Sequence, residues 1–183
     1  INTVCGIYTL VNLSLKILKN GLINMGLEKV IWGGSGIEKC LFDFIAAKIP
    51  AGSTVIELGS GACSTQALSS IYKLYSIEDN GKFINAYNGS TYIAAPLVNG
   101  WYDRDTVTRS IPSSYSLVFV DGPAGEGNRS GLLNNLDLFD SSAVFIFHDI
   151  YRAPERQLAI DVANKLNKTV TFYEEGDYWA VVE

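Results

Sequence analysis

The sequence predicts an α/β protein built on a mostly parallel sheet that ends in an antiparallel hairpin. Three observations support this fold class. Short apolar runs alternate with segments of helical periodicity along residues 37–166. The first apolar run, residues 54–58, passes directly into a glycine turn, as at ligand-binding strand ends in parallel sheets. The last residues, 169–182, hold two β-rich runs joined by Glu-Glu-Gly-Asp, which is a hairpin signal.

The chain is expected to begin with helices. Residues 7–31 carry apolar side chains at three- and four-residue spacing, which predicts a helix. A glycine-rich connector follows over residues 32–36. Ser35 and Glu38 fit a capping box for a second helix over residues 37–48. We therefore expect a helical cap and a connector ahead of the first strand.

Strands and helices then alternate. The apolar runs lack the polar alternation of half-exposed strands, which is typical of buried parallel strands. Pro96 predicts that the third strand lies at an edge. In the loop over residues 99–108, the rings of Trp101 and Tyr102 could stack on an adenine or pack in the core. Strands are expected over residues 54–58, 74–77, 92–98, 117–120 and 143–147, and helices over 64–71, from 83 onward, 132–139 and 154–166.

Composition limits the class of partner. The 183 residues, 48% of them hydrophobic, predict a single domain over 1–183, of which 1–36 form the cap and connector. The net charge of −5 and the absence of a Lys/Arg-rich run argue against a nucleic-acid partner. No segment predicts a membrane span. Three scattered cysteines predict reduced thiols in a cytoplasmic protein. The oligomeric state is left open.

The glycine turn after the first strand is the centre of the predicted site. It reads Glu-Leu-Gly-Ser-Gly-Ala-Cys-Ser-Thr from Glu57 onward. Gly59 and Gly61 allow a sharp turn and a close approach to a ligand, because neither carries a Cβ. The helix that opens near Ser64 and Thr65 would direct free N–H groups toward that ligand.

This turn resembles the first motif of the class I S-adenosylmethionine-dependent methyltransferases, Glu-x-Gly-x-Gly. The resemblance implies a Rossmann-like, seven-stranded sheet, with S-adenosylmethionine as cofactor and S-adenosylhomocysteine as product. The methionine part would lie at the turn, and Glu78 after the second strand would take the ribose diol, since two syn hydroxyls can donate to one carboxylate. The expected cofactor-binding residues are Glu57, Gly59, Ser60, Gly61, Ser64, Thr65, Glu78, Asp79 and Asp121.

Two later strand ends point to the methyl acceptor. Asp121 opens an Asp-Gly-Pro run with Arg129 downstream, and His148 opens a His-Asp-x-x-Arg run that contains Asp149 and Arg152. These runs resemble the plant glucuronoxylan methyltransferases and related bacterial sugar methyltransferases. The resemblance implies O-methylation of a sugar, glycan or other small-molecule hydroxyl. Arg129 and Arg152 could clamp a substrate carboxylate, or form ordinary surface ion pairs.

The expected catalytic residues are Asp121, His148 and Asp149. A sulfonium is already a good methyl donor, so the protein must align the reactants and remove the hydroxyl proton. His148, the single histidine, is suited to that task near neutrality, and the two aspartates are alternative bases. The three could instead bind a divalent metal. Catechol-type methyltransferases use two aspartates and an asparagine for magnesium, but Ile150 stands at the asparagine position, so a metal is left open.

Two other functions remain as alternatives. An NAD(P)-dependent oxidoreductase shares the glycine turn and the acid after strand two, but Ser64 replaces the third glycine of its motif and no Tyr-x-x-x-Lys pair occurs. A non-catalytic cofactor-binding module of a larger protein is the other, and a first residue of Ile rather than Met keeps it open.

Overall fold

The computed structural model describes residues 30–33, 36–124, 128–174 and 178–183. Seven strands form the main sheet, and two short strands form a separate ribbon. The main strands are β1 (Thr54–Leu58), β2 (Lys73–Glu78), β3 (Ser90–Ala94), β6 (Leu117–Val120), β7 (Val144–His148), β8 (Val170–Tyr173) and β9 (Trp179–Val182), and the ribbon joins β4 (Leu97–Val98) to β5 (Trp101–Tyr102).

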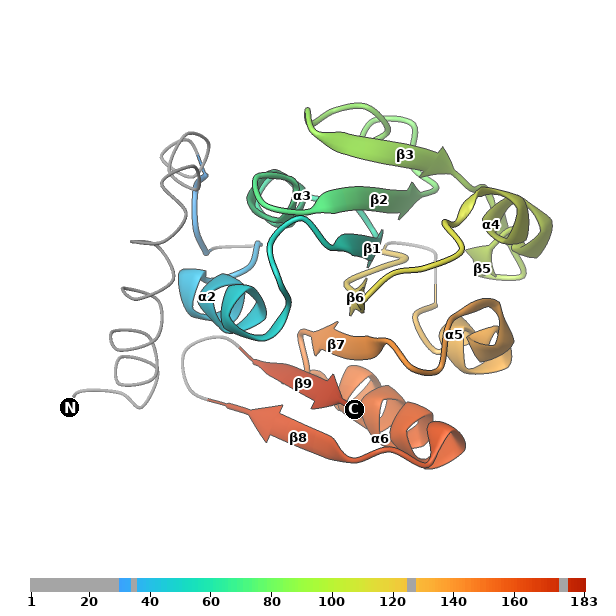
Figure 1. Ribbon diagram of the computed structural model, residues 1–183. Helices are drawn as coiled ribbons and strands as arrows, with labels where there is room; N and C mark the ends of the chain where they lie inside the picture. Colours follow the sequence, from blue (N-terminus) through green and yellow to red (C-terminus); the bar gives the residue numbers. More distant parts are fainter. Residues whose placement is uncertain (1–29, 34–35, 125–127, 175–177) are drawn as a thin grey trace.

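The main sheet has the strand order β3-β2-β1-β6-β7-β9-β8 (Figure 1). The strands from β3 to β7 pair in parallel, and β9 runs antiparallel to both β7 and β8. The predicted fold class is therefore confirmed, including the C-terminal hairpin. Because four neighbouring strands, β2, β1, β6 and β7, run in the same direction, their carboxyl ends meet at one edge of the sheet.

Helices cover both faces of this sheet. They are α2 (Lys39–Lys48), α3 (Ser64–Ser69), α4 (Arg104–Ser110), α5 (Gly131–Asn134), the 3₁₀ turn η2 (Leu136–Leu138) and α6 (Ala153–Leu166). Helices α2 and α3 lie on one side of the sheet, and α4, α5 and α6 lie on the other (Figure 1). One cluster of buried side chains joins α2 and α3 to the sheet, and another joins α4, α5 and α6 to it. All four residues of β6 are buried, and they alternate between the two clusters, as expected for a strand covered on both faces.

The N-terminal predictions are only partly covered by the described residues. Residues 30 and 31 form no helix, and the rest of the helix expected over 7–31 lies outside the described residues, as does Ser35. Helix α2 begins at Lys39, after an N-cap residue, Glu38, whose side chain makes no capping hydrogen bond. Its packing face includes Phe42, which is buried although the helical pattern did not single it out.

The stretch from residue 83 to 108 differs most from prediction. Turns replace the helix expected from Phe83, and Asn85 takes a left-handed conformation that interrupts helical geometry. Pro96, which has no N–H to donate, separates β3 from β4, although β3 is the edge strand that was predicted. The expected loop after it contains β5 and α4. Helix α4 forms because Asp103 caps it by accepting the Thr106 N–H at 2.9 Å.

The helix predicted over residues 132–139 is divided into α5 and η2. Asn135 lies between them, outside helical geometry, and its side chain donates to the carbonyl of Gly131 at 2.8 Å. Asparagine competes with the helix in this way because its short amide reaches nearby backbone groups.

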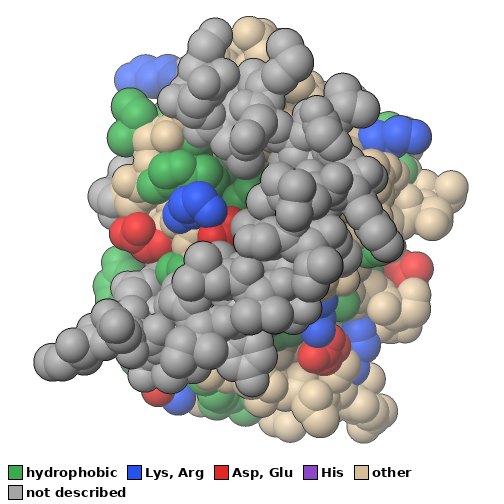
Figure 2. Space-filling view, turned by 60° about the vertical axis from the view of Figure 1, so that its left-hand side comes forward, with side chains coloured by type: hydrophobic (Ala, Val, Ile, Leu, Met, Phe, Trp, Pro, Cys, Tyr) green, Lys and Arg blue, Asp and Glu red, His purple; other side chains and the backbone are tan. Residues whose placement is uncertain are grey.

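The surface carries mixed charge. On the face drawn in Figure 2, basic side chains of the described residues lie beside acidic and apolar ones rather than in one patch. In the same part of the chain, no helix has the length and apolar character required to cross a bilayer.

Candidate active site

The centre of the site is a direct contact between the backbones that follow β1 and β6. Gly59 has a φ of +82°, and a Cβ placed on it would lie 2.8 Å from the Cα of Gly122. A Cβ on Gly122 would lie 2.6 Å from the Cα of Gly59. Both positions therefore require glycine, the first also for its backbone conformation. Sequence analysis missed the role of Gly122, although the Asp-Gly-Pro run after a strand marked the position.

Glu57 lies fully buried beneath the glycine turn. Its Oε2 accepts hydrogen bonds from Thr65 Oγ1 at 2.8 Å and from Ser76 Oγ at 2.5 Å. Its Oε1 has no hydrogen-bond partner among the described residues. Burial raises the pKa of Glu57 to about 7, although nearby hydroxyl groups partly oppose this effect. Ser76 was not predicted, but it lies directly opposite Glu57 on the neighbouring strand.

Thr65 links the glycine turn to Glu57 through two hydrogen bonds. Its Oγ1 accepts from the N–H of Gly61 at 3.0 Å while donating to Glu57. Ser64 and Thr65 are both buried, and a Cβ on Gly61 would lie 3.2 Å from Ser64 Oγ. Gly61, Ser64 and Thr65 therefore stabilise the turn through contacts among themselves. The Gly61 N–H donates to Thr65 and is not directed at a ligand.

Glu78 joins the end of β2 to the same turn. Its Oε2 accepts from the N–H of Ser60 at 2.8 Å and from Ser60 Oγ at 3.0 Å. Its Oε1 accepts from the N–H groups of Asp79 at 3.0 Å and Asn80 at 2.8 Å. The carboxylate thus holds four hydrogen bonds from its own neighbourhood. Beside it, Asp79 is half-buried, and its pKa is raised by burial and by the charge of Glu78.

Tyr102 reaches the site from the small ribbon. A Cβ on Gly122 would lie 2.5 Å from the Tyr102 hydroxyl oxygen, which has no hydrogen-bond partner within the described part of the chain. Burial raises the pKa of this phenol well above its usual value, and the charge of Glu78 raises it further. Trp101 packs edge-on against Tyr102, and both rings are buried. Of the two roles left open for these rings, packing in the core is the one observed.

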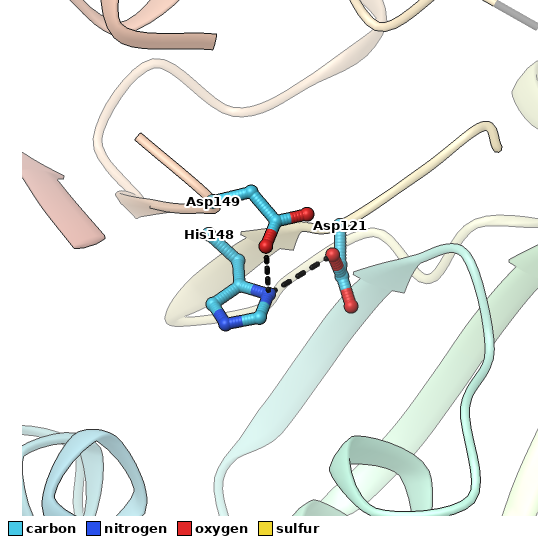
Figure 3. Close-up of side chains that lie close together, drawn as sticks. All are labelled: Asp121, His148 and Asp149. Carbon is cyan, nitrogen blue, oxygen red and sulfur yellow. Dashed lines mark hydrogen bonds and ion pairs between the residues drawn. The ribbon is translucent and has the colours of Figure 1, made fainter. Parts of the chain in front are cut away.

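Asp121, His148 and Asp149 come together at the ends of β6 and β7 (Figure 3). His148 Nδ1 lies 3.1 Å from Asp121 Oδ1 and 3.6 Å from Asp149 Oδ1. Asp149 has a φ of +63°, which turns the chain sharply after β7. Aspartate tolerates this left-handed conformation better than most residues, because its side chain can hydrogen-bond locally.

Two arginines complete this cluster. Arg129 Nη2 donates to Asp121 Oδ1 at 3.0 Å and to Asp149 Oδ2 at 3.2 Å, and its Nη1 reaches the carbonyl of His148 at 3.4 Å. The Arg129 side chain is 10% exposed, whereas that of Arg152 is 47% exposed. Arg152 pairs with Asp149 at 3.2 Å and donates from Nε to the Tyr151 hydroxyl at 3.0 Å. Arg129 therefore holds the carboxylates together, and Arg152 faces outward.

The same cluster is the place to test for a metal. Ligand atoms of Asp121, His148 and Asp149 all lie within 4.8 Å of one another, close enough to share an ion. However, Arg129 already binds both aspartates, and one of its contacts uses the Asp121 oxygen that also meets His148. The two carboxylates and the imidazole are suitable metal ligands, but the positively charged Arg129 side chain between the carboxylates is not compatible with a metal ion there.

Solved structures resemble the fold of this chain, although no protein-family model and no curated protein sequence matches it. Precorrin 8W decarboxylase from Methanobacterium thermoautotrophicum aligns with a TM-score of 0.58 at 15% identity, covering 85% of this chain and 96% of that one. The C-terminal domain of precorrin-6Y C5,15-methyltransferase from Rhodobacter capsulatus gives 0.53 at 10% identity, covering 86% and 94%. An SAH-bound methyltransferase from Podospora anserina gives 0.53 at 12% identity, covering 81% and 80%.

The chain has the class I methyltransferase fold. Low identities mean that these likenesses establish the fold and not the reaction. In this fold, the site lies at the carboxyl edge of the parallel strands, where the described residues place Gly59, Glu78, Asp121 and His148. Those residues fit S-adenosylmethionine in two respects. Gly59 and Gly122 form a tight backbone contact with no room for a Cβ, which keeps the turn compact, and Glu78 supplies a carboxylate that accepts the N–H of Ser60 in the same turn.

Proposed function

We propose that the chain is an S-adenosylmethionine-dependent O-methyltransferase whose acceptor is a hydroxyl of a sugar, a glycan or another small molecule. The observation behind this proposal is the position of the Asp121–His148 pair, which meets at 3.1 Å on the strand ends next to the Gly59–Gly122 contact. A proton-accepting pair thus adjoins the glycine turn of a methyltransferase fold.

The cofactor would lie across the ends of β1, β2 and β6. Glu78 would accept the ribose hydroxyls after the Ser60 hydroxyl rotates away, since Ser60 is half-buried and that contact is the one not made by the backbone. Gly59 and Gly122 would keep the turn compact next to the bound molecule, because their backbones touch and neither position has room for a Cβ. Glu57, whose Oε1 has no hydrogen-bond partner among the described residues, would accept a hydrogen bond from the methionine ammonium beneath the turn. The cofactor supplies an electrophilic methyl group on a positively charged sulfur.

The acceptor would bind over the ends of β6 and β7. The cluster of Asp121, His148 and Asp149 would receive the hydroxyl proton, which must leave as the oxygen–carbon bond forms. Arg152, half-exposed and adjacent to Asp149, is the arginine available to an acceptor carboxylate such as that of a uronic acid. Arg129 is instead bonded to the two aspartates, which supports a positioning role in place of the substrate clamp expected from sequence.

Strand arrangement separates this proposal from an oxidoreductase. A dinucleotide-binding fold has a mostly parallel sheet with strand order 3-2-1-4-5-6, whereas here β9 enters antiparallel between β7 and β8. Calorimetry on the full chain should give S-adenosylhomocysteine binding in the micromolar range, on the order of −8 kcal/mol, and no NAD binding. NAD binding without a response to either adenosyl ligand would refute the cofactor assignment.

The acceptor is tested separately, with labelled S-adenosylmethionine and a panel of hydroxyl compounds. We expect label on a sugar or small-molecule hydroxyl, with uronic acids favoured. The panel should include ribosomal RNA, because an rRNA methylase from Streptococcus thermophilus shares the fold at a TM-score of 0.52. Label on RNA alone would overturn the small-molecule assignment. Cofactor binding with no transfer to any member of a broad panel would favour a non-catalytic module.

A further inference from the structure

We infer that the Arg129 guanidinium takes the place that a divalent metal would need between Asp121 and Asp149, so that the cluster works as a metal-free site. This inference concerns the cluster itself and does not depend on whether the chain transfers a methyl group. It makes Arg129 a positioning residue, which holds two carboxylates beside His148 and excludes a competing cation.

Geometry gives the first reason. Arg129 Nη2 lies 3.0 Å from Asp121 Oδ1 and 3.2 Å from Asp149 Oδ2, so one nitrogen bridges the two carboxylates. A divalent metal would need oxygen ligands from the same two residues at about 2.0–2.6 Å. Asp121 Oδ1 also contacts His148 Nδ1 at 3.1 Å. Arg129 Nη2 therefore lies between Asp121 Oδ1 and Asp149 Oδ2, where a metal ion that bound both carboxylates would have to lie.

Charge gives the second reason. Asp121 and Asp149 carry two formal negative charges, and Arg129 and Arg152 each pair with at least one of them. The four groups are neutral in sum. Adding a dication would leave two uncompensated positive charges beside a guanidinium whose side chain is only 10% exposed. Like charges in a partly buried site repel strongly, because little water is present to screen them.

The backbone holds Arg129 in this position. Asn128 donates its N–H to the carbonyl of Gly100 at 2.7 Å, and its side chain accepts from the N–H of Ser130 at 2.9 Å. Helix α5 begins directly afterwards, at Gly131. The residues on both sides of Arg129 are therefore fixed by hydrogen bonds. Its guanidinium then reaches groups from two strand ends, including the carbonyl of His148. Such a preorganised arginine binds two carboxylates with little loss of side-chain freedom.

Manganese binding to the full chain tests the inference without any methyl acceptor. Electron paramagnetic resonance distinguishes free aquo Mn²⁺ from protein-bound Mn²⁺. We expect the wild-type chain, cleared of metals by a chelator, to leave Mn²⁺ free. Arg129→Met keeps much of the side-chain volume but removes the charge, and it should bind one Mn²⁺ per chain, on the order of a hundredfold more tightly than wild type. Adding Asp149→Asn to Arg129→Met should abolish that binding.

Two controls separate the charge of Arg129 from its packing. Arg129→Lys retains one positive charge and should stay free of Mn²⁺. Arg104→Met removes another arginine paired with an aspartate, Asp137, and should gain no site. The inference fails if the wild-type chain binds Mn²⁺ in a manner lost in Asp149→Asn. It also fails if a folded Arg129→Met chain, verified by circular dichroism, binds no more Mn²⁺ than wild type.

Discussion

Glu57 is the carboxyl group whose proton affinity folding alters most clearly among the described residues, since its pKa rises from 4.5 to about 7. The folded chain therefore holds this proton more tightly than the unfolded chain. Below pH 4.5 both states are protonated and stability is unaffected. As the pH rises from 4.5 to about 7, the unfolded chain ionises first, and the free energy of unfolding falls by about 3 kcal/mol in total.

Glu57→Gln should remove this dependence. Urea denaturation over a pH series from about 5 to about 8 should show wild type losing stability relative to the variant as the pH rises. Glu174→Gln makes the same chemical change at an exposed position and should follow the wild-type curve. Parallel curves for wild type and Glu57→Gln would mean that Glu57 is already ionised in the folded chain throughout this range.

His148 and Asp149 are tested as residues that act in the proposed reaction. His148→Ala and Asp149→Asn should each lower turnover on a confirmed acceptor by about a hundredfold or more, since proton removal is lost. Affinity for S-adenosylhomocysteine should stay nearly unchanged, because Gly59 follows β1 and Glu78 ends β2, whereas His148 and Asp149 are at the end of β7. Asparagine suits the left-handed backbone at residue 149, so Asp149→Asn should remain folded.

The matched control for these variants is Asp105→Asn, which changes an exposed carboxylate on α4. Its turnover should equal that of wild type. Full activity in both His148→Ala and Asp149→Asn would make the cluster structural and end its assignment as the site of proton removal.

Among the elements, β1 and β6 are coupled at their carboxyl ends through the Gly59–Gly122 contact. Gly59→Val should weaken S-adenosylhomocysteine binding by on the order of tenfold or more, because the side chain would collide with the Gly122 backbone and displace the turn from β6. Gly122→Ala should act in the same direction. The two changes together should cost less than the sum of their separate effects, since both disrupt one contact.

Gly81→Val provides the control for the Gly59–Gly122 prediction, because nothing lies within 4 Å of a Cβ at that position. Calorimetry gives the affinities, and thermal denaturation confirms that each variant is folded. Wild-type affinity in a folded Gly59→Val chain would show that the cofactor does not use this turn.

The sequence predicts elements well where the pattern is strong and local. Apolar strands such as β1 and β6 were placed from their residues alone, since both faces are buried. The short elements β5 and α4 were missed, because β5 holds only two residues and α4 depends on its Asp103 cap. Hydrophobic periodicity carries little information over such lengths.

At the scale of the whole molecule, topology explains how much of the site the sequence could reveal. Parallel strands place Glu78, Asp121 and His148 at the same edge of the sheet whatever their separation in the chain, so strand-end residues could be singled out in advance. Contacts between side chains from distant parts of the fold could not be predicted in this way. The bridge from Arg129 to Asp149 and the approach of Tyr102 to Gly122 depend on side-chain directions that a residue pattern does not contain.

Glu78 shows what a fully hydrogen-bonded carboxylate implies for selectivity. The Ser60 hydroxyl already donates to the Glu78 oxygen that the proposal gives to the ribose, so binding of the cofactor there would exchange one neutral hydroxyl for another. Such an exchange adds little affinity. If the ligand lacked one ribose hydroxyl, the Ser60 hydroxyl would again donate to Glu78, and the carboxylate would keep the same number of hydrogen bonds. A phosphate at the same place finds no cationic partner in Glu78 and meets its negative charge. In the proposed cofactor site, the carboxylate would therefore act mainly as a filter against phosphorylated nucleotides.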